Sequence, residues 1–118
     1  MFLNNLFSIS STESTSEKIS AEIQIAPDHK IFEGHFPDSP VTPGVVQLQI
    51  VKDILETHFH TSLTMKTMRT CKFLHILNPV ETPALTIDIK FVQGEFLDVV
   101  ASGAHAGTVY FKAQISYI

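Results

Sequence analysis

Residues 34–45 (GHFPDSPVTPGV) place one histidine, His35, inside a segment that three prolines make stiff. The prolines at positions 37, 40 and 43 hold the backbone φ at about −65° and remove backbone N–H donors, so neither a helix interior nor a central strand can form there. An imidazole can accept or donate a proton near neutral pH, and a stiff loop would hold it close to one geometry. The segment therefore predicts a catalytic loop that carries His35.

The chain after this loop predicts one long helix, which begins near Gly44 and reaches Phe59. Apolar residues recur from Val45 onward at spacings that suit a helix, and charged residues come together only from residue 52 onward. The first two turns are apolar nearly all round, which is typical of a helix that the rest of a fold encloses. We therefore expect only the charged C-terminal half of the helix to reach water.

One strand is expected before this helix and about four after it. Lys18 to Ala26 alternates apolar and polar residues with the period of two that marks a half-buried strand. Residues 8–17 are rich in Ser, Thr and Glu and predict an exposed loop. Turn-forming residues separate the later strands. These strands are expected over Leu63 to Leu77, Ala84 to Val92, Phe96 to Ala104 and Thr108 to Tyr117.

The length of 118 residues, with 44% hydrophobic and 17% charged residues, predicts one globular domain over residues 1–118. No apolar run approaches the roughly 20 residues that a membrane span needs. The first residues also lack the basic start and long apolar stretch of a signal peptide. We therefore expect a cytoplasmic protein that does not enter the membrane.

Charge and motif content narrow the classes of partner and cofactor. The net charge is −4, and no run of Lys or Arg interleaved with aromatic residues is present, which argues against nucleic-acid binding. The sequence has no glycine-rich phosphate loop or metal-ligand cluster, and His58 and His60 would lie on different faces of a helix. We expect no metal and no cofactor. The single cysteine, Cys71, lies among apolar residues and is interpreted as a packed thiol.

The expected order of strand, proline loop, long helix and further strands is of the α+β type. One long central helix wrapped by an antiparallel sheet of about five strands is the hot-dog fold. Residues 32–37 (FEGHFP), followed by residues 40–41 (PV) and 43–45 (PGV), resemble the signature of the 3-hydroxyacyl-[acyl-carrier-protein] dehydratases of fatty acid synthesis. Residues 72–73 (KF) and 79–80 (PV) also resemble that family's next strand and turn.

The resemblance implies how the chain would dehydrate a 3-hydroxyacyl thioester. That reaction needs a base for the proton on C2, stabilisation of the thioester oxygen as it gains charge, and a proton for the departing hydroxyl. The resemblance assigns the base to His35. It places the thioester carbonyl at the backbone N–H groups of Gly44 and Val45, where the start of a helix favours negative charge. Phe36 and Pro43 are the further substrate-binding residues that it implies.

Gln49 marks a departure from that family. The dehydratases carry Glu or Asp on the helix, five residues after the glycine that corresponds to Gly44, and this chain has Gln49 there. Glutamine can orient a hydroxyl or a water through hydrogen bonds, but it cannot give up a proton as a general acid. Asp53 shares the helix face of Gln49, but it lies one turn, about 5.4 Å, further along and is too far to make the same hydrogen bond. His35 could instead serve both proton transfers.

Three functions from different classes remain open. The first is an acyl-thioester dehydratase, or hydratase in reverse, that acts on chains carried by acyl carrier protein or coenzyme A in fatty acid or related lipid and polyene synthesis. The second is a non-catalytic acyl-binding or partner subunit of a hot-dog heterodimer, and the third is a thioesterase in which His35 and Gln49 position water. The resemblance and an otherwise unpaired strand edge also predict a homodimer or higher homo-oligomer, or a heterodimer with a related subunit.

Overall fold

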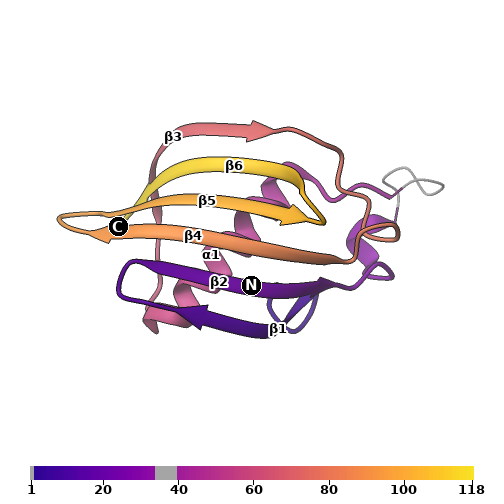
Figure 1. The fold of residues 1–118 in the computed structure, drawn as a ribbon, viewed down its shortest axis with the longest axis horizontal. Coiled ribbons are helices and arrows are strands. Elements are labelled where there is room, and N and C mark those ends of the chain that lie inside the picture. Colours follow the sequence, from indigo (N-terminus) through magenta and orange to yellow (C-terminus); the bar gives the residue numbers. More distant parts are fainter. Residues whose placement is uncertain (1, 34–39) are drawn as a thin grey trace.

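The computed structural model describes residues 2–33 and 40–118, in which one α-helix packs against a six-stranded antiparallel sheet (Figure 1). The elements are β1 (Phe7–Ser14), β2 (Lys18–Ile25), the 3₁₀-helix η1 (Lys30–Phe32), α1 (Gly44–Phe59), β3 (Met65–Phe73), β4 (Ala84–Gln93), β5 (Leu97–His105) and β6 (Thr108–Tyr117). The strands lie side by side in the order β1-β2-β4-β5-β6-β3, so β1 and β3 form the two edges. In Figure 1 the sheet faces the viewer and α1 crosses behind it.

Alternation of apolar and polar residues builds the face of the sheet that α1 covers. In β2 the buried residues are Ile19, Ala21, Ile23 and Ile25, whereas the residues between them are exposed or half-buried. Strands β4 and β5 show the same alternation, as does β6 from Phe111 to Ile115. Because successive side chains of a strand point to opposite faces, the pattern gives the sheet one apolar face. The buried apolar residues of α1 belong to the same core cluster.

Strand β1 shows that the exposed loop expected over residues 8–17 was wrong. The strand pairs with β2 from Phe7 opposite Ile25 to Ser14 opposite Ile19. Most of its side chains are exposed, so no alternating apolar pattern marks it in the sequence. Its backbone pairing with β2 and the buried side chain of Phe7 hold it in place. The sheet therefore has six strands, where about five were expected.

Strand β3 is shorter than the strand expected over Leu63 to Leu77, and it forms an exposed edge. It ends at Phe73, and all of its side chains except the half-buried Cys71 are exposed. Two register shifts interrupt its pairing with β6, as β-bulges commonly do at sheet edges. Beyond β3 the chain turns toward the start of α1, where the Thr42 N–H donates to the carbonyl oxygen of Leu77 (2.8 Å). Residues 74–77, the end of the expected strand, therefore lie outside the sheet.

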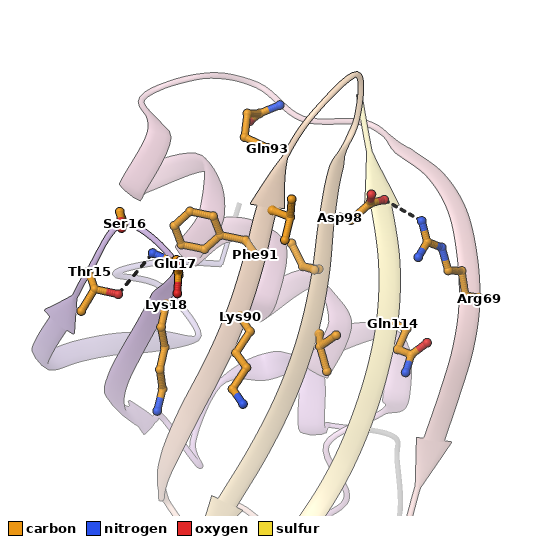
Figure 2. A pocket seen from close by; sticks show the side chains of 13 residues that line it. Thr15, Ser16, Glu17, Lys18, Arg69, Lys90, Phe91, Gln93, Asp98 and Gln114 are labelled. Carbon is orange, nitrogen blue, oxygen red and sulfur yellow. Dashed lines mark hydrogen bonds and ion pairs between the residues drawn. The ribbon is translucent and has the colours of Figure 1, made fainter.

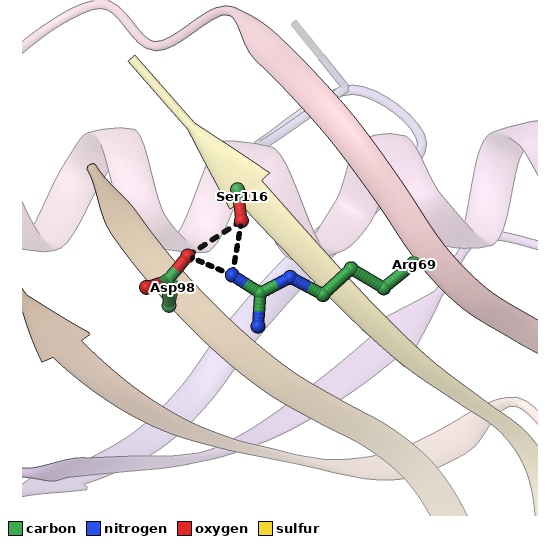
Figure 3. Close-up of polar contacts among 3 residues, drawn as sticks. All are labelled: Arg69, Asp98 and Ser116. Carbon is green, nitrogen blue, oxygen red and sulfur yellow. Dashed lines mark hydrogen bonds and ion pairs between the residues drawn. The ribbon is translucent and has the colours of Figure 1, made fainter.

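A triangle of polar contacts ties β3 to β5 and β6 (Figure 3). The Arg69 guanidinium donates to Asp98 Oδ1 at 2.7 Å and to Ser116 Oγ at 3.0 Å, and Ser116 Oγ donates to the same Asp98 oxygen at 2.5 Å. An exposed ion pair by itself contributes little to stability. Here the ion pair shares its hydrogen bonds with Ser116, which is only 2% exposed. We therefore infer that the contacts among Arg69, Asp98 and Ser116 hold the edge strand β3 against the sheet, where bulges interrupt its backbone pairing with β6.

Helix α1 departs from the expectation that only its charged half reaches water. Val45 in the first turn is 76% exposed, whereas Asp53 in the second half is fully buried, because two N–H donors satisfy its carboxylate. Neither α1 nor any other helix in the described part of the chain is long and apolar enough to cross a membrane.

Exposed and half-buried residues spaced three or four apart form the uncovered face of α1, which consists of Val45, Leu48, Gln49, Lys52 and Glu56.

Candidate functional site

The start of α1 provides the backbone N–H groups on which the expected carbonyl site depends. Pro43 precedes the helix, and its carbonyl oxygen accepts hydrogen bonds from the N–H groups of Val46 (3.0 Å) and Gln47 (3.1 Å). The N–H groups of Gly44 and Val45 have no acceptor within the helix, as in any first turn. They point along the helix dipole, which favours negative charge in front of the first turn. This end of α1 therefore suits an oxygen that gains charge during a reaction.

Phe73 occupies the space that the missing side chain of Gly44 leaves. A Cβ on Gly44 would lie only 2.5 Å from the Cζ atom of the Phe73 ring, which is closer than real Cβ contacts. Phe73 is 48% exposed at the end of β3, so its ring lies between the helix start and solvent. No pattern in the sequence indicated this contact, because the two residues come from different elements.

Gln49 lies one turn after Val45 on the uncovered face of α1, and both residues line two grooves. The structure thus brings together two of the predicted site residues, whereas Pro43 and Gly44 line a separate hollow of about 350 Å³ beside the segment that follows β3. The larger groove, of about 640 Å³, is also lined by Phe2, Ile31, Val46, Lys52 and Glu56. The smaller groove, of about 220 Å³ between α1 and β3, is also lined by Leu48, Lys52, Met65, Met68 and Tyr117.

Asp53, which was expected to lie too far along α1 to take the role of Gln49, contacts Gln49 directly. Its Oδ1 accepts a hydrogen bond from Gln49 Nε2 at 2.8 Å, and its Oδ2 accepts one from the backbone N–H of Phe2 at 2.6 Å. The spacing of four residues between Gln49 and Asp53 was a usable signal, because Gln and Asp one turn apart on a helix often form a hydrogen bond. The contact with the N-terminal segment had no such signal. Asp53 therefore acts on Gln49 itself and does not replace it.

Tyr117 contributes a buried phenol to the smaller groove. Its side chain has no exposed surface, and within the described residues its Oη has no hydrogen-bond partner. Burial, together with the negative charge of Glu56, raises the pKa of Tyr117 to about 12. The phenol therefore keeps its proton at neutral pH and stays an uncharged hydroxyl in the groove that Gln49 also lines.

Two of the predicted site residues, His35 and Phe36, lie outside the described residues. Their flanks are described on both sides: η1 ends at Phe32, and the chain resumes at Pro40, three residues before the residue that precedes α1. The proposed roles of His35 and Phe36 consequently stay predictions from the sequence and its resemblance.

The other histidines lie in the described part of the chain, where they belong to no group of potential metal ligands. His58 packs edge-on against Phe59, with 4.7 Å between the ring centroids, and His75, exposed beyond the end of β3, packs against Tyr110 at 6.2 Å. His105 is exposed at the turn between β5 and β6. Among residues 2–33 and 40–118, no group of three or more His, Cys, Asp or Glu side chains could hold a metal ion.

A larger hollow of about 940 Å³ lies on the face of the sheet opposite α1 (Figure 2). Lys18 and Lys90, which are cross-strand partners in β2 and β4, extend from this face in the same direction. The hollow mixes basic, acidic, amide and valine side chains, and none of the predicted site residues in the described part of the chain lines it. Its size alone therefore does not make it the site of the expected chemistry.

Comparisons with known proteins agree with the fold and with the motif. A family model described as ApeI-like, ApeI dehydratase, matches residues 11–107. "The Dehydratase Heterocomplex ApeI:P from Xenorhabdus doucetiae" contains a chain that is 20% identical with a TM-score of 0.75, and the match covers 92% of this chain and 95% of that chain. An uncharacterized protein from Erwinia carotovora subsp. atroseptica is 22% identical with a TM-score of 0.63, over 93% of this chain and 91% of that chain. No curated protein matches this chain. The structural likeness confirms the expected α+β hot-dog fold, with six strands in place of about five.

Proposed function

We propose that this chain, which belongs to the ApeI-like dehydratase family, is a dehydratase-like protein. In this proposal it acts on 3-hydroxyacyl thioesters of fatty acid or related lipid and polyene synthesis. The observation that carries the proposal is the position of Gln49. It lies on the uncovered face of α1, five residues after the glycine that opens the helix, and lines both a smaller groove with largely apolar walls and a larger groove with mixed polar and apolar walls. An acyl chain needs apolar walls, and its polar head needs a few placed hydrogen-bonding groups.

In this proposal His35 removes the proton from C2 of the substrate while the N–H groups of Gly44 and Val45 stabilise the thioester oxygen. The C2–H bond breaks, a double bond forms between C2 and C3, and the C3–O bond breaks. His35 then returns the proton to the departing hydroxyl, which leaves as water, so the products are an enoyl thioester and water. Phe36 and Pro43 would contact the substrate beside this centre. Gln49 would orient the hydroxyl without donating a proton from an acid.

A specific observation favours a second candidate, a partner subunit that binds the acyl chain but lacks full activity. Gln49 cannot serve as a general acid, and its amide nitrogen is already bonded to Asp53. The similar chain from Xenorhabdus doucetiae belongs to a structure described as a heterocomplex. By analogy, a related subunit with a carboxylic acid at this position would supply the missing group to a shared site.

Both candidates place another subunit against β3. That strand is an edge with unpaired backbone groups, and Met65 and Met68 on it are 40% and 42% exposed beside the 76% exposed Val45 of α1. We propose that a second copy, or a related subunit, continues the sheet here and covers the uncovered face of α1. The carrier of the acyl group is acyl carrier protein or coenzyme A.

The test is to incubate the purified protein with 3-hydroxyacyl and enoyl thioesters and to identify the products by mass spectrometry. A dehydratase interconverts the two with the thioester intact, whereas a thioesterase releases free thiol. His35→Ala is expected to lower dehydration by at least about 100-fold, and His105→Ala, which changes an exposed histidine at the turn between β5 and β6, serves as the control. Turnover that appears only when a related subunit is added would establish the partner role. Release of free thiol as the sole product would contradict both candidates.

A further inference from the structure

The carboxylate of Asp53 is fully buried, and within the described residues it accepts hydrogen bonds from two N–H donors. Gln49 Nε2 donates to Oδ1 at 2.8 Å, and the Phe2 N–H donates to Oδ2 at 2.6 Å. The ion pairs among residues 2–33 and 40–118 are Lys18–Asp88 and Arg69–Asp98, and neither involves Asp53. A buried carboxylate depends on the hydrogen bonds that it accepts. Asp53 is therefore stabilised when Gln49 turns a hydrogen-bond donor toward it.

This stabilisation decides which end of the Gln49 amide faces the grooves. An ionised carboxylate can only accept hydrogen bonds, so Gln49 must turn its NH₂ group toward Asp53. The amide oxygen of Gln49 then points away from the buried side of α1. Because Gln49 lines the grooves of about 640 Å³ and 220 Å³ on the open side, that oxygen is the hydrogen-bond acceptor that Gln49 offers to a ligand there.

We propose that Asp53 is a positioning residue that fixes the Gln49 amide with its oxygen toward the grooves, so that the site selects acyl chains with a hydroxyl on C3 over chains with a 3-oxo group. This inference rests on the proposed function, which places C3 of the substrate beside Gln49. A 3-hydroxyl can donate to the amide oxygen, whereas a 3-oxo group is an acceptor and faces another acceptor. One hydrogen bond gained or lost corresponds to a preference of roughly two- to tenfold in affinity.

The experiment compares the binding of three non-reacting pantetheine amides that carry octanoyl, 3-hydroxyoctanoyl and 3-oxooctanoyl chains. Wild-type protein is expected to bind the 3-hydroxy amide about two- to tenfold more tightly than the 3-oxo amide. In Asp53→Asn one acceptor replaces two, so the Gln49 amide loses its fixed orientation and the ratio should fall to about one. Gln49→Met should give the same loss. Gln24→Met is the control, because Gln24 is an exposed glutamine of β2 that lines neither groove.

An unchanged ratio in a folded Asp53→Asn protein, together with a lost ratio in Gln49→Met, would overturn the positioning role. If Asp53→Asn does not fold, the side-chain NH₂ resonances of Gln49 in wild-type protein decide the question. A carboxylate partner should shift one of the two protons downfield and slow its exchange with water, and two protons with the shifts and exchange rates of an exposed glutamine amide would contradict the contact. Failure of all three amides to bind would count against the proposed function, while the NMR result would still test the contact of Asp53 with Gln49.

Discussion

The amide of Gln49 and a carboxylic acid at the same position differ in what they can do to the hydroxyl of a substrate. A carboxylic acid can donate a proton as the C3–O bond breaks, whereas the Gln49 amide can only form hydrogen bonds. The contact of its nitrogen with Asp53 (2.8 Å) restricts it further, because the oxygen is then left for the substrate. An acceptor holds a hydroxyl in place but does not help it leave. At the scale of single residues, the proposed role of Gln49 is therefore to hold a substrate hydroxyl in place and not to protonate it as it leaves.

Gln49→Glu is expected to raise 3-hydroxyacyl dehydration by about 10² to 10⁴-fold, the usual contribution of a positioned general acid. The new carboxyl group would lie next to Asp53, and two carboxyl groups so close cannot both ionise readily. The pair keeps one proton to a higher pH than a lone carboxyl group, so the rate should fall as pH rises through the upper titration of the pair. Lys52 and Glu56 line the same groove and act on this titration in opposite directions.

The measurement is kcat/KM as a function of pH for wild type and Gln49→Glu. A variant that never exceeds wild type at any pH would contradict the argument. Adding His35→Ala to Gln49→Glu is the control, because the gain should vanish if it depends on the proposed base.

Tyr117 gives a prediction at alkaline pH, because its pKa is raised from 10.0 to about 12 in the folded protein. The stabilisation that belongs to the protonated phenol is fully present below pH 10. Between pH 10 and about 12 the unfolded chain releases this proton while the folded chain keeps it, so the free energy of unfolding falls with pH, by about 3 kcal/mol in all. Tyr117→Phe should remove this loss.

Urea unfolding of wild type and Tyr117→Phe at several pH values between about 8 and 12 measures the effect. Tyr110→Phe is the control, since Tyr110 is only half-buried and shares a hydrogen bond with Thr82 (3.2 Å), and it should leave the alkaline slope in place. Equal slopes in wild type and Tyr117→Phe would show that another group causes the loss.

At the scale of elements, the start of α1 packs against the end of β3 through the contact between Gly44 and Phe73. The Phe73 ring lies where a Cβ on Gly44 would be, at 2.5 Å. The edge strand therefore reaches the helix N-terminus at the position of the proposed carbonyl site. Any change in β3 that moves this ring also changes access to the first N–H groups of α1.

Gly44→Ala is expected to be destabilising when Phe73 is present and neutral or stabilising when Phe73 is replaced by Ala. Alanine favours a helix more than glycine does by about 1 kcal/mol, but the clash with the ring opposes this gain. A double-mutant cycle from thermal or urea unfolding should give a coupling of about 1 kcal/mol or more. Gly94→Ala, at a position with no atom within 4 Å of the added Cβ, should show no coupling to Phe73. Additive effects of Gly44→Ala and Phe73→Ala would contradict the fit.

Elements that bury one face were predicted with close bounds, whereas of the two strands without such a face β1 was missed and β3 was expected too long. Helix α1 begins at Gly44 and ends at Phe59 as expected, because its apolar residues carry the helical period. Strand β1 was missed because its pairing is made by the backbone while its side chains stay exposed. The position of Gln49 followed from its spacing to Gly44. The burial of Asp53 did not follow, because one of its two donors comes from the distant N-terminal segment.

At the scale of the whole molecule, exposed apolar residues gather at one edge. Strand β3, the segment after it and the start of α1 hold most of the large apolar side chains that are exposed in the described chain. The same edge has unpaired backbone groups. Contiguous apolar surface beside an open strand edge marks an interaction site. These residues are Val45, Met65, Met68, Phe73, Leu74, Ile76 and Val80.

Met68→Lys should therefore separate the subunits, while Val92→Lys should not. Both changes place a charge on an exposed apolar position of a strand, but Met68 (42% exposed) lies on the edge strand β3, and Val92 (69% exposed) lies on β4 inside the sheet. Light scattering after size exclusion should give wild type and Val92→Lys a mass of about 26 kDa, twice the 13.1 kDa of one chain, and Met68→Lys the mass of one chain. If wild type alone is monomeric, the same comparison with a related subunit distinguishes a heterodimer. A wild-type chain that stays monomeric both alone and with such a subunit would remove the basis for a shared site, because the face of α1 that carries Gln49 would then stay open to water.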